Sequence, residues 1–137
     1  MDVFSAETRS RVMTSIGGKN TRPERLVRSI AHKLGLRFRL HRRDLPGTPD
    51  LVLLRHRTVI FVHGCFWHRH RCKRGSLPKT HRTFWKTKLE GNRMRDRRIG
   101  TALKRRGWRV VVVWECETKH PAALRTRLVG CFGKSPN

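Results

Sequence analysis

Residues 63–72, HGCFWHRHRC, place three histidines, two cysteines and a Phe-Trp pair within ten positions. Imidazole nitrogen and cysteine sulfur are preferred ligands of zinc, and a site closed by four such ligands is typically structural. A distant cysteine, Cys116, follows a second apolar run and completes a set of four. The predicted ligands of a structural zinc site are Cys65, Cys72, Cys116 and either His68 or His70. The spacing alone does not choose between the two histidines.

Other interpretations of these cysteines stay open. Four cysteines can form two disulfides in a secreted protein, but the N-terminal sequence MDVFSAETRS does not have the pattern of a signal peptide, so we expect none. Buried thiols without a metal are common in protein interiors. A catalytic zinc with an open coordination position is the third alternative.

A second candidate site lies around Asp50, which follows the turn LPGTP and begins an apolar run. The next apolar run, 58–63, follows after a short basic connector, so Asp50 and the end of that run are expected side by side. Carboxylate and main-chain carbonyl oxygens suit magnesium, which lowers the pKa of bound water and stabilises charge on an attacked phosphate. The alternative is that Asp50 is only a turn residue.

Histidines near this strand end are candidates for proton transfer, because histidine titrates near neutrality. His63 and His68 are so placed, although either one alone is more often a surface or ligand histidine. A helix predicted over 83–106 carries a line of residues at spacings of three and four. The line consists of Trp85, Lys88, Asn92 and Asp96, and it continues into Ile99 and Leu103. It predicts a face that leaves the core and meets a ligand; a solvated face is the alternative.

The charge of the chain is strongly positive. Its 33 Lys and Arg against nine Asp and Glu give a formal net charge of +24, which is typical of proteins that bind polyanions. No apolar stretch approaches the ~20 residues of a spanning helix, so we expect no membrane insertion. At 137 residues the chain suits a single domain.

Periodicity and caps predict the order α-β-β-β-α-β-α, and hence an α/β domain with a mixed central sheet. Gly35 and Gly107 are expected to end helices, whereas Gly91 and Gly100 weaken the long one. A shorter helix is predicted over 5–16. The predicted helices are 21–34, 83–106 and 121–129, and the predicted strands are 37–41, 50–54, 58–63 and 108–114.

Asp50, HGCFWHRHRC, FWKTKLEGNRMRDRR and WRVVVVWEC, in this order and spacing, closely resemble the very short patch repair (Vsr) endonucleases, from about Thr8 to Cys116. The resemblance implies a restriction-endonuclease-like fold, related to the PD-(D/E)xK enzymes, with a structural zinc site. It implies a nick 5′ to the thymine of a T:G mismatch, which arises when 5-methylcytosine is deaminated. The products would carry a 3′-hydroxyl and a 5′-phosphate, and very short patch repair would follow.

The resemblance also implies roles for single residues. Asp50 would bind magnesium together with the backbone carbonyl of Val62, and His68 would be the principal acid/base residue. The side chains expected around them are His63, Asp96 and Glu24. Val62 stands where the best-known relative has threonine, which does not matter if only the carbonyl binds metal. The usual Glu-x-Lys element does not follow Asp50, so a histidine must replace the lysine.

The implied zinc ligands and DNA contacts complete this set. Zinc would be held by Cys65, His70, Cys72 and Cys116, so that His70 is favoured over His68. The implied aromatic wedge, inserted beside the mismatch, consists of Phe66, Trp67 and Trp85. The implied base readers are Lys88 and Asn92, and the implied minor-groove contacts are Met13 and Ile16.

We therefore expect one Vsr-like domain over 1–137, with a DNA-contacting arm (1–20), a core (21–130) and a tail (131–137). It is expected to be monomeric, cytoplasmic and nucleoid-associated in a bacterium, with a mismatch-repair scaffold protein as a candidate partner. The main rival is a non-catalytic zinc protein that binds nucleic acid, which leaves the carboxylates unexplained. A ribosome-associated basic protein and a ββα-metal nuclease are further rivals; the first does not explain the Phe-Trp pair, and the second does not need the 108–114 strand.

Overall fold

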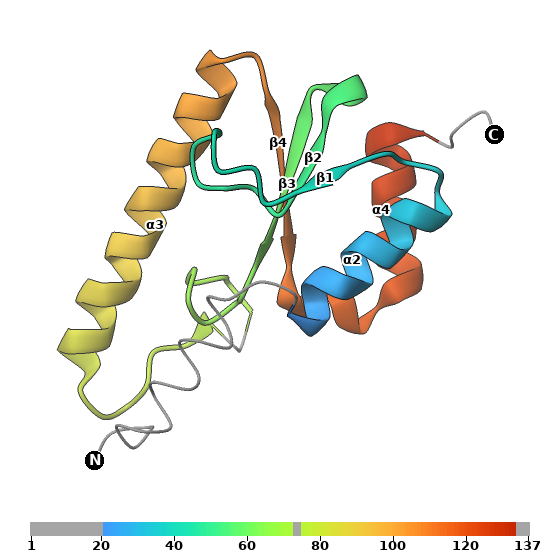
Figure 1. Ribbon diagram of the computed structural model, residues 1–137. Coiled ribbons are helices and arrows are strands. Elements are labelled where there is room, and N and C mark those ends of the chain that lie inside the picture. Colours follow the sequence, from blue (N-terminus) through green and yellow to red (C-terminus); the bar gives the residue numbers. More distant parts are fainter. Residues whose placement is uncertain (1–20, 73–74, 134–137) are drawn as a thin grey trace.

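The computed structural model describes residues 21–72 and 75–133 as helices packed on a central sheet (Figure 1). The helices are α2 (Arg22–Lys33), α3 (Arg82–Arg105) and α4 (Pro121–Phe132). The strands are β1 (Arg39–Leu40), β2 (Leu51–Leu53), β3 (Thr58–His63) and β4 (Arg109–Trp114). Two short 3-10 helices, η1 (Leu54–His56) and η3 (Glu115–Lys119), follow β2 and β4.

The predicted mixed sheet is confirmed for these residues, in the order β1-β2-β3-β4. β1 and β2 are antiparallel, as are β2 and β3, whereas β3 and β4 are parallel and are connected through α3. In the register, Leu51 lies opposite Ile60 and His63 opposite Trp114. The C-terminal end of β3 therefore lies beside both the start of β2 and the end of β4.

Helices cover both faces of the sheet (Figure 1). On one face, α2 and α4 pack their apolar sides on residues such as Leu51, Ile60 and Val113, all fully buried. On the other face, Leu103 of α3 packs against Val59 and neighbouring side chains. No helix in the described ranges is long and apolar enough to cross a membrane.

Local signals fixed most element ends as predicted. The side chain of Thr21 accepts a hydrogen bond from the Glu24 N–H at 3.4 Å and caps α2. Gly107 ends α3 with a φ of +86°, a conformation that glycine adopts without strain. Gly91 and Gly100 do not interrupt α3. The helix predicted over 5–16 lies outside the described residues.

Several predicted boundaries were wrong. The strand predicted over 37–41 is reduced to two exposed residues, because His41 turns out of it with a φ of 47°. β4 was predicted as a buried strand, but only Val111 and Val113 are buried, whereas the alternate residues are intermediate or exposed. The reason is its position at an edge of the sheet, where one face is only partly covered. Helix α4 continues to Phe132, three residues beyond the prediction.

Candidate active site and metal centre

The turn before β2 places Asp50 beside the end of β3, as predicted. Asp50 Oδ2 accepts a hydrogen bond from the Val62 N–H at 2.6 Å. Gly47 allows this turn to approach α3, because a Cβ there would lie 2.5 Å from Cγ2 of Ile99. The carboxylate is thus held at the junction of two strands, and it does more than start a turn.

Burial raises the pKa of Asp50 to about 6, with a further upward contribution from Glu24. The Val62 hydrogen bond and the nearby His41 and Arg28 act in the opposite direction. The raised pKa means that the surroundings of Asp50 do not supply enough positive charge to stabilise its ionised carboxylate. A divalent cation bound there would therefore favour its ionised form.

Glu24 and His41 join Asp50 in a group whose candidate ligand atoms lie within 4.8 Å of one another. Glu24 is 2% exposed and accepts a hydrogen bond from Arg28 at 2.9 Å. His41 Nε2 lies 2.5 Å from Glu24 Oε1 and 3.8 Å from Asp50 Oδ1. His41 was not predicted as a site residue. The available signal was its position at the end of a strand expected to pair with the one that starts at Asp50.

A second group joins His63, His68 and Asp96. The two imidazole rings stack with centroids 3.8 Å apart, and His68 Nδ1 lies 2.6 Å from Asp96 Oδ2. Burial lowers the pKa of His63 to about 4, helped by His68 and opposed by Asp96. His63 is therefore neutral at neutral pH.

Both groups line one cleft of about 550 Å³, between the sheet end and α3. The predicted face of α3 contributes to it with Lys88, Asn92 and Asp96. The predicted residues on its wall are Glu24, Asp50, Val62, His63, Trp67, His68, Lys88, Asn92 and Asp96. The cleft therefore brings together carboxylates able to hold a metal ion and a histidine paired with an aspartate.

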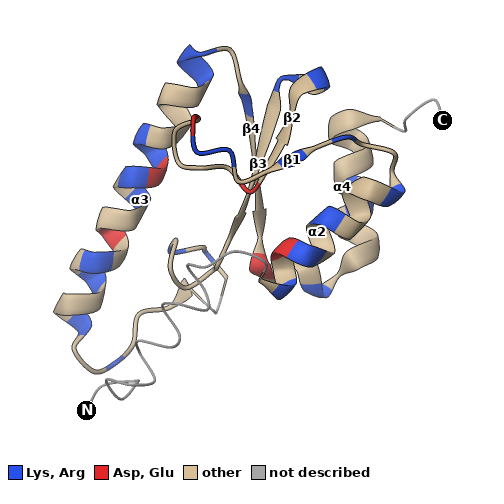
Figure 2. Ribbon diagram, in the orientation of Figure 1, with Lys and Arg blue, Asp and Glu red and all other residues tan. Residues whose placement is uncertain are grey.

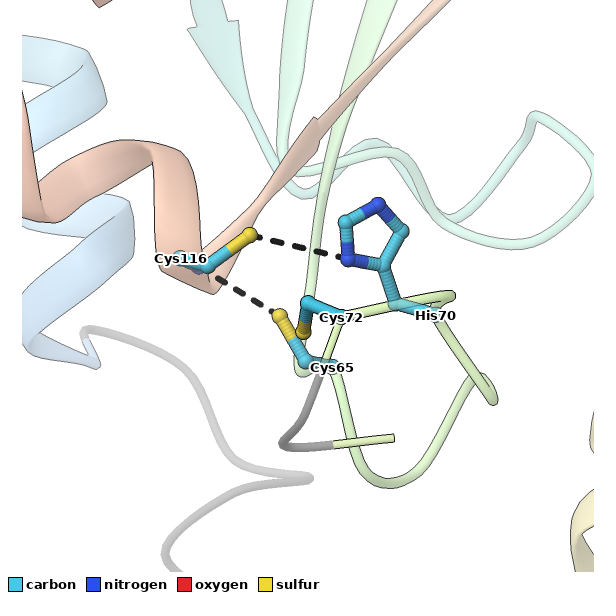
Figure 3. A group of neighbouring side chains, drawn as sticks. All are labelled: Cys65, His70, Cys72 and Cys116. Atoms are coloured by element: carbon cyan, nitrogen blue, oxygen red, sulfur yellow. Dashed lines mark hydrogen bonds between the residues drawn. The ribbon is translucent and has the colours of Figure 1, made fainter. Parts of the chain in front are cut away.

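Beside the cleft, Cys65, His70, Cys72 and Cys116 form a separate cluster (Figure 3). Their candidate ligand atoms lie within 4.8 Å of one another, and Cys116 Sγ is 3.5 Å from His70 Nδ1. Tetrahedral zinc with Zn–S bonds of ~2.3 Å needs similar separations, so this cluster could hold a metal ion. No disulfide joins the described cysteines.

Geometry separates the two histidines that the spacing left open. His70 lies with the cysteines and stacks on Trp114 at 4.2 Å, whereas His68 pairs with Asp96. Burial raises the pKa of the Cys65 thiol to about 12. Its thiolate form therefore requires a compensating cation, which a bound metal ion would provide.

The three predicted wedge aromatics pack together in a small cluster. Phe66 and Trp67 lie 5.4 and 5.9 Å from the ring of Trp85, and Leu89 supports them from α3. Trp85 is fully buried, and Trp67 is only 8% exposed although it lines the cleft, so most of the surface of both rings is covered in this arrangement. The indole N–H groups of Trp67 and Trp85 are buried with no hydrogen-bond acceptor within the described part of the chain.

The residues predicted to contact DNA bases lie in different environments. Asn92 donates a hydrogen bond to the Trp67 carbonyl at 3.0 Å, so in this conformation it holds the loop that carries the aromatics. Lys88 lines the cleft. Phe84, which the sequence did not single out, is 49% exposed and contacts Trp85. Met13 and Ile16 lie outside the described residues.

Comparison with known proteins decides the family. The profile described as DNA mismatch endonuclease Vsr matches residues 1–74. The chain belongs to the Vsr family of DNA mismatch endonucleases. It is 54% identical to the type II nicking enzyme V.XorIIP of Xanthomonas oryzae pv. oryzae over 127 residues, 93% of each chain. It is 44% identical to the DNA mismatch endonuclease Vsr of Escherichia coli over 115 residues, 84% of this chain and 74% of that protein.

This Vsr-family protein is a DNA mismatch endonuclease. Its net charge of +24 suits a DNA substrate. The family assignment decides against the rival of a non-catalytic zinc protein.

Proposed function

We propose that this endonuclease nicks one strand of duplex DNA 5′ to the thymine of a T:G mismatch, using magnesium and leaving a 3′-hydroxyl and a 5′-phosphate. The observation that carries the proposal is the shared cleft, in which Asp50 and the His68–Asp96 pair line the same cavity. A phosphodiester in that cleft would meet both a metal-binding carboxylate and a proton-transfer group. The metal would activate water and stabilise charge on the phosphate, and the proton-transfer group would exchange a proton with water or the leaving oxygen.

Asp50 and the carbonyl of Val62 would hold the magnesium ion. The hard oxygen donors fit this metal, and the buried Asp50 carboxylate gains from a cation beside it. When bound, magnesium lowers the pKa of water and stabilises charge on the phosphate. His41 would link the two carboxylates, because its Nε2 lies 2.5 Å from Glu24 Oε1 and 3.8 Å from Asp50 Oδ1.

His68 would transfer the proton. Its Nδ1 is engaged by Asp96 at 2.6 Å, which leaves Nε2 for the substrate or the attacking water. The carboxylate also stabilises the imidazolium that forms when Nε2 accepts a proton. His63, whose pKa is about 4, is neutral and supports His68 by stacking.

We further propose a structural zinc ion held by Cys65, His70, Cys72 and Cys116. All four are soft ligands within mutual reach, and a set with no open position suits a structural site. Zinc would hold the loop that carries Phe66, Trp67 and His68. We propose a restriction-endonuclease-like fold, supported by a mixed sheet with helices on both faces and the metal-binding carboxylate at a strand end.

Phe66, Trp67 and Trp85 would form the wedge. Insertion of aromatics costs a few kcal/mol of unstacking per step and least at a mispaired step, so insertion discriminates against normal duplex. Opening of the aromatic cluster on DNA would expose the buried indole N–H groups of Trp67 and Trp85, for which the described residues offer no acceptor. Lys88 and Asn92 would then read base edges, and Met13 and Ile16 would contact the minor groove.

The protein would act as a monomer with a single domain, in which an arm over 1–20 precedes the core. The core, predicted over 21–130 with a tail over 131–137, also includes residues 131 and 132, because α4 continues to Phe132. The protein would work in the bacterial cytoplasm at the nucleoid, where its DNA substrate lies. A mismatch-repair scaffold protein is a candidate partner.

A nicking panel tests the proposal. End-labelled duplexes with T:G, T:A and other mismatches are incubated with magnesium and the wild type, Asp50→Ala, His68→Ala or the exposed control His32→Ala. We expect one nick in the T:G duplex from the wild type and the control, and none from the two cleft variants. If T:G and T:A duplexes are cleaved equally, or if both cleft variants stay active, the proposal is rejected.

A further inference from the structure

A second hollow, of about 730 Å³, lies between α3 and β4 and is separate from the catalytic cleft. The two cavities share His63, His68 and Asp96, which form a common wall. Val110, Val112 and other β4 residues line the second hollow, which we call the α3–β4 groove. It lies over the edge of the sheet that α3 leaves partly uncovered.

The α3–β4 groove differs from the cleft in its charge. Its cations are Arg69, Arg71, Arg93, Arg97 and Lys104, and Asp96, already paired with His68, is the one carboxylate among its described lining residues. The cleft has three carboxylates. The cleft therefore suits a metal cation and the groove suits an anion.

Among the described residues, no carboxylate neutralises the groove cations on α3. No carboxylate in the described ranges lies within ion-pair distance of Arg93, Arg97 or Lys104. These residues, spaced by four and seven positions, share a face of a helix whose basic residues continue along its length (Figure 2). From 93 to 104 the helix rises ~16 Å at 1.5 Å per residue, close to the axial length of about five nucleotides of one DNA strand.

Gly100 adds an observation independent of charge. It lines the groove inside the C-terminal third of α3, where glycine weakens a helix relative to alanine. The described residues give no steric reason for it, because a Cβ at this position would meet no atom within 4 Å. A missing side chain at the centre of a basic groove fits the close approach of a ligand.

We propose that the α3–β4 groove binds the phosphodiester backbone of the DNA strand next to the scissile phosphate. This inference rests on the proposed function for the location of the scissile phosphate. The strand passes the common wall of His63 and His68 and continues along Arg93, Arg97 and Lys104. Gly100 lets the backbone approach α3, and the apolar side chains of β4 contact the sugars.

Salt-dependent binding tests the groove. Anisotropy of a fluorescein-labelled T:G duplex is measured without added magnesium from about 50 to 200 mM KCl, where each phosphate contact adds about 0.9 to the slope of log Kd against log salt. The variant Arg93→Gln/Arg97→Gln is compared with Arg25→Gln/Arg125→Gln, which removes the same charge from exposed sites on α2 and α4. We expect the groove variant to lose about 1.8 of slope and at least about tenfold in affinity, and the control to lose far less.

Nicking under single-turnover conditions separates binding from chemistry. The groove variant should keep its rate at saturating enzyme, because the cleft is intact, while the half-saturating concentration rises about tenfold. Equal slopes and affinities for the two double variants would overturn the groove. If the wild type fails to nick the T:G duplex, the proposed function is overturned. The groove is then still tested by the comparison of salt slopes between the two double variants.

Gly100→Ala gives a second readout that does not remove charge. The control Gly130→Ala, in α4, also places its Cβ in open space. Both should raise Tm, by about 3 °C, because alanine favours the helix. Only Gly100→Ala should weaken DNA binding, by about tenfold. Unchanged DNA affinity in Gly100→Ala would contradict close approach of the backbone.

Discussion

His63 and His68 lie face to face, with ring centroids 3.8 Å apart and an angle of 3° between their planes. The two rings nevertheless have different surroundings. His68 pairs with Asp96 at 2.6 Å, whereas burial and the neighbouring His68 hold the pKa of His63 at about 4. His63 is thus held neutral at neutral pH, whereas the stacked His68 has a carboxylate as its partner.

Asp96→Asn should reduce nicking of a T:G duplex by about 10²–10⁴-fold with little change in DNA affinity. The amide cannot stabilise a charged His68, although it is close in shape to the carboxylate. Single-turnover rates and anisotropy measure the two effects separately. The exposed carboxylate Glu90 on the same helix provides the control Glu90→Gln, which should nick normally. Equal rates for the wild type and Asp96→Asn would remove Asp96 from the mechanism.

His63→Gln should alter the pH dependence of stability. In the wild type the pKa of His63 is about 4 when folded and 6.5 in the reference state, so the unfolded chain binds a proton first as pH falls. The free energy of unfolding therefore decreases from pH 6.5 to 4, by about 3 kcal/mol from this group. Urea melts followed by tryptophan fluorescence, without added magnesium, should show a shallower decrease of the free energy of unfolding with falling pH in His63→Gln. Parallel curves for the two proteins would count against the buried, neutral ring.

Asp50 should affect the pH dependence of stability in the opposite direction to His63, which the variant Asp50→Asn tests. The pKa of Asp50 is raised from 3.8 to about 6, so the folded state keeps a proton that the unfolded chain has lost. The contribution of Asp50 to the free energy of unfolding is therefore fully present below pH 3.8 and is lost as the pH rises to about 6. Above pH 6 and without metal, the amide variant should be more stable than the wild type by about 1–3 kcal/mol. Asp44→Asn, at an exposed aspartate of the same turn region, should not show this gain.

With magnesium present, the wild type should become more stable than Asp50→Asn. A ligand that binds only the folded state stabilises it by RT ln(1 + [L]/Kd), so magnesium should raise the Tm of the wild type. Asp50→Asn should show little response and should not nick. If magnesium stabilises both proteins equally, the ion binds elsewhere.

Much of this fold follows from local sequence signals. The β-branched run of β3 and the Thr21 cap of α2 were sufficient to place those elements, because each signal acts within a few residues. The convergence of Asp50 and Val62 was also predictable, since a short connector between strands implies their pairing. The shortening of β1 was not, because it depends on the conformation of a single residue, His41.

Features that depend on tertiary contacts could not be predicted from the sequence patterns. His41 belongs to the cleft because a buried glutamate from α2 comes within 2.5 Å of it. The burial of Trp85 depends on how the 63–72 loop folds back on α3, which helical periodicity does not describe. His68 and His70 differ in the side chains that other elements bring to them: Asp96 of α3 contacts His68, and Cys116 of η3, just after β4, contacts His70.

Metal removal tests the cysteine cluster. The protein should contain about one zinc per chain, and a strong chelator should release it together with a large decrease in Tm, because binding energy is part of folding energy at structural sites. Cys72→Ser should lower zinc content and Tm, whereas Cys131→Ser, at a cysteine outside the cluster, should change neither. Mass spectrometry after iodoacetamide should find Cys65 protected until the metal is removed. Free alkylation of Cys65 in the native protein, or normal zinc content in Cys72→Ser, would contradict the four-ligand site.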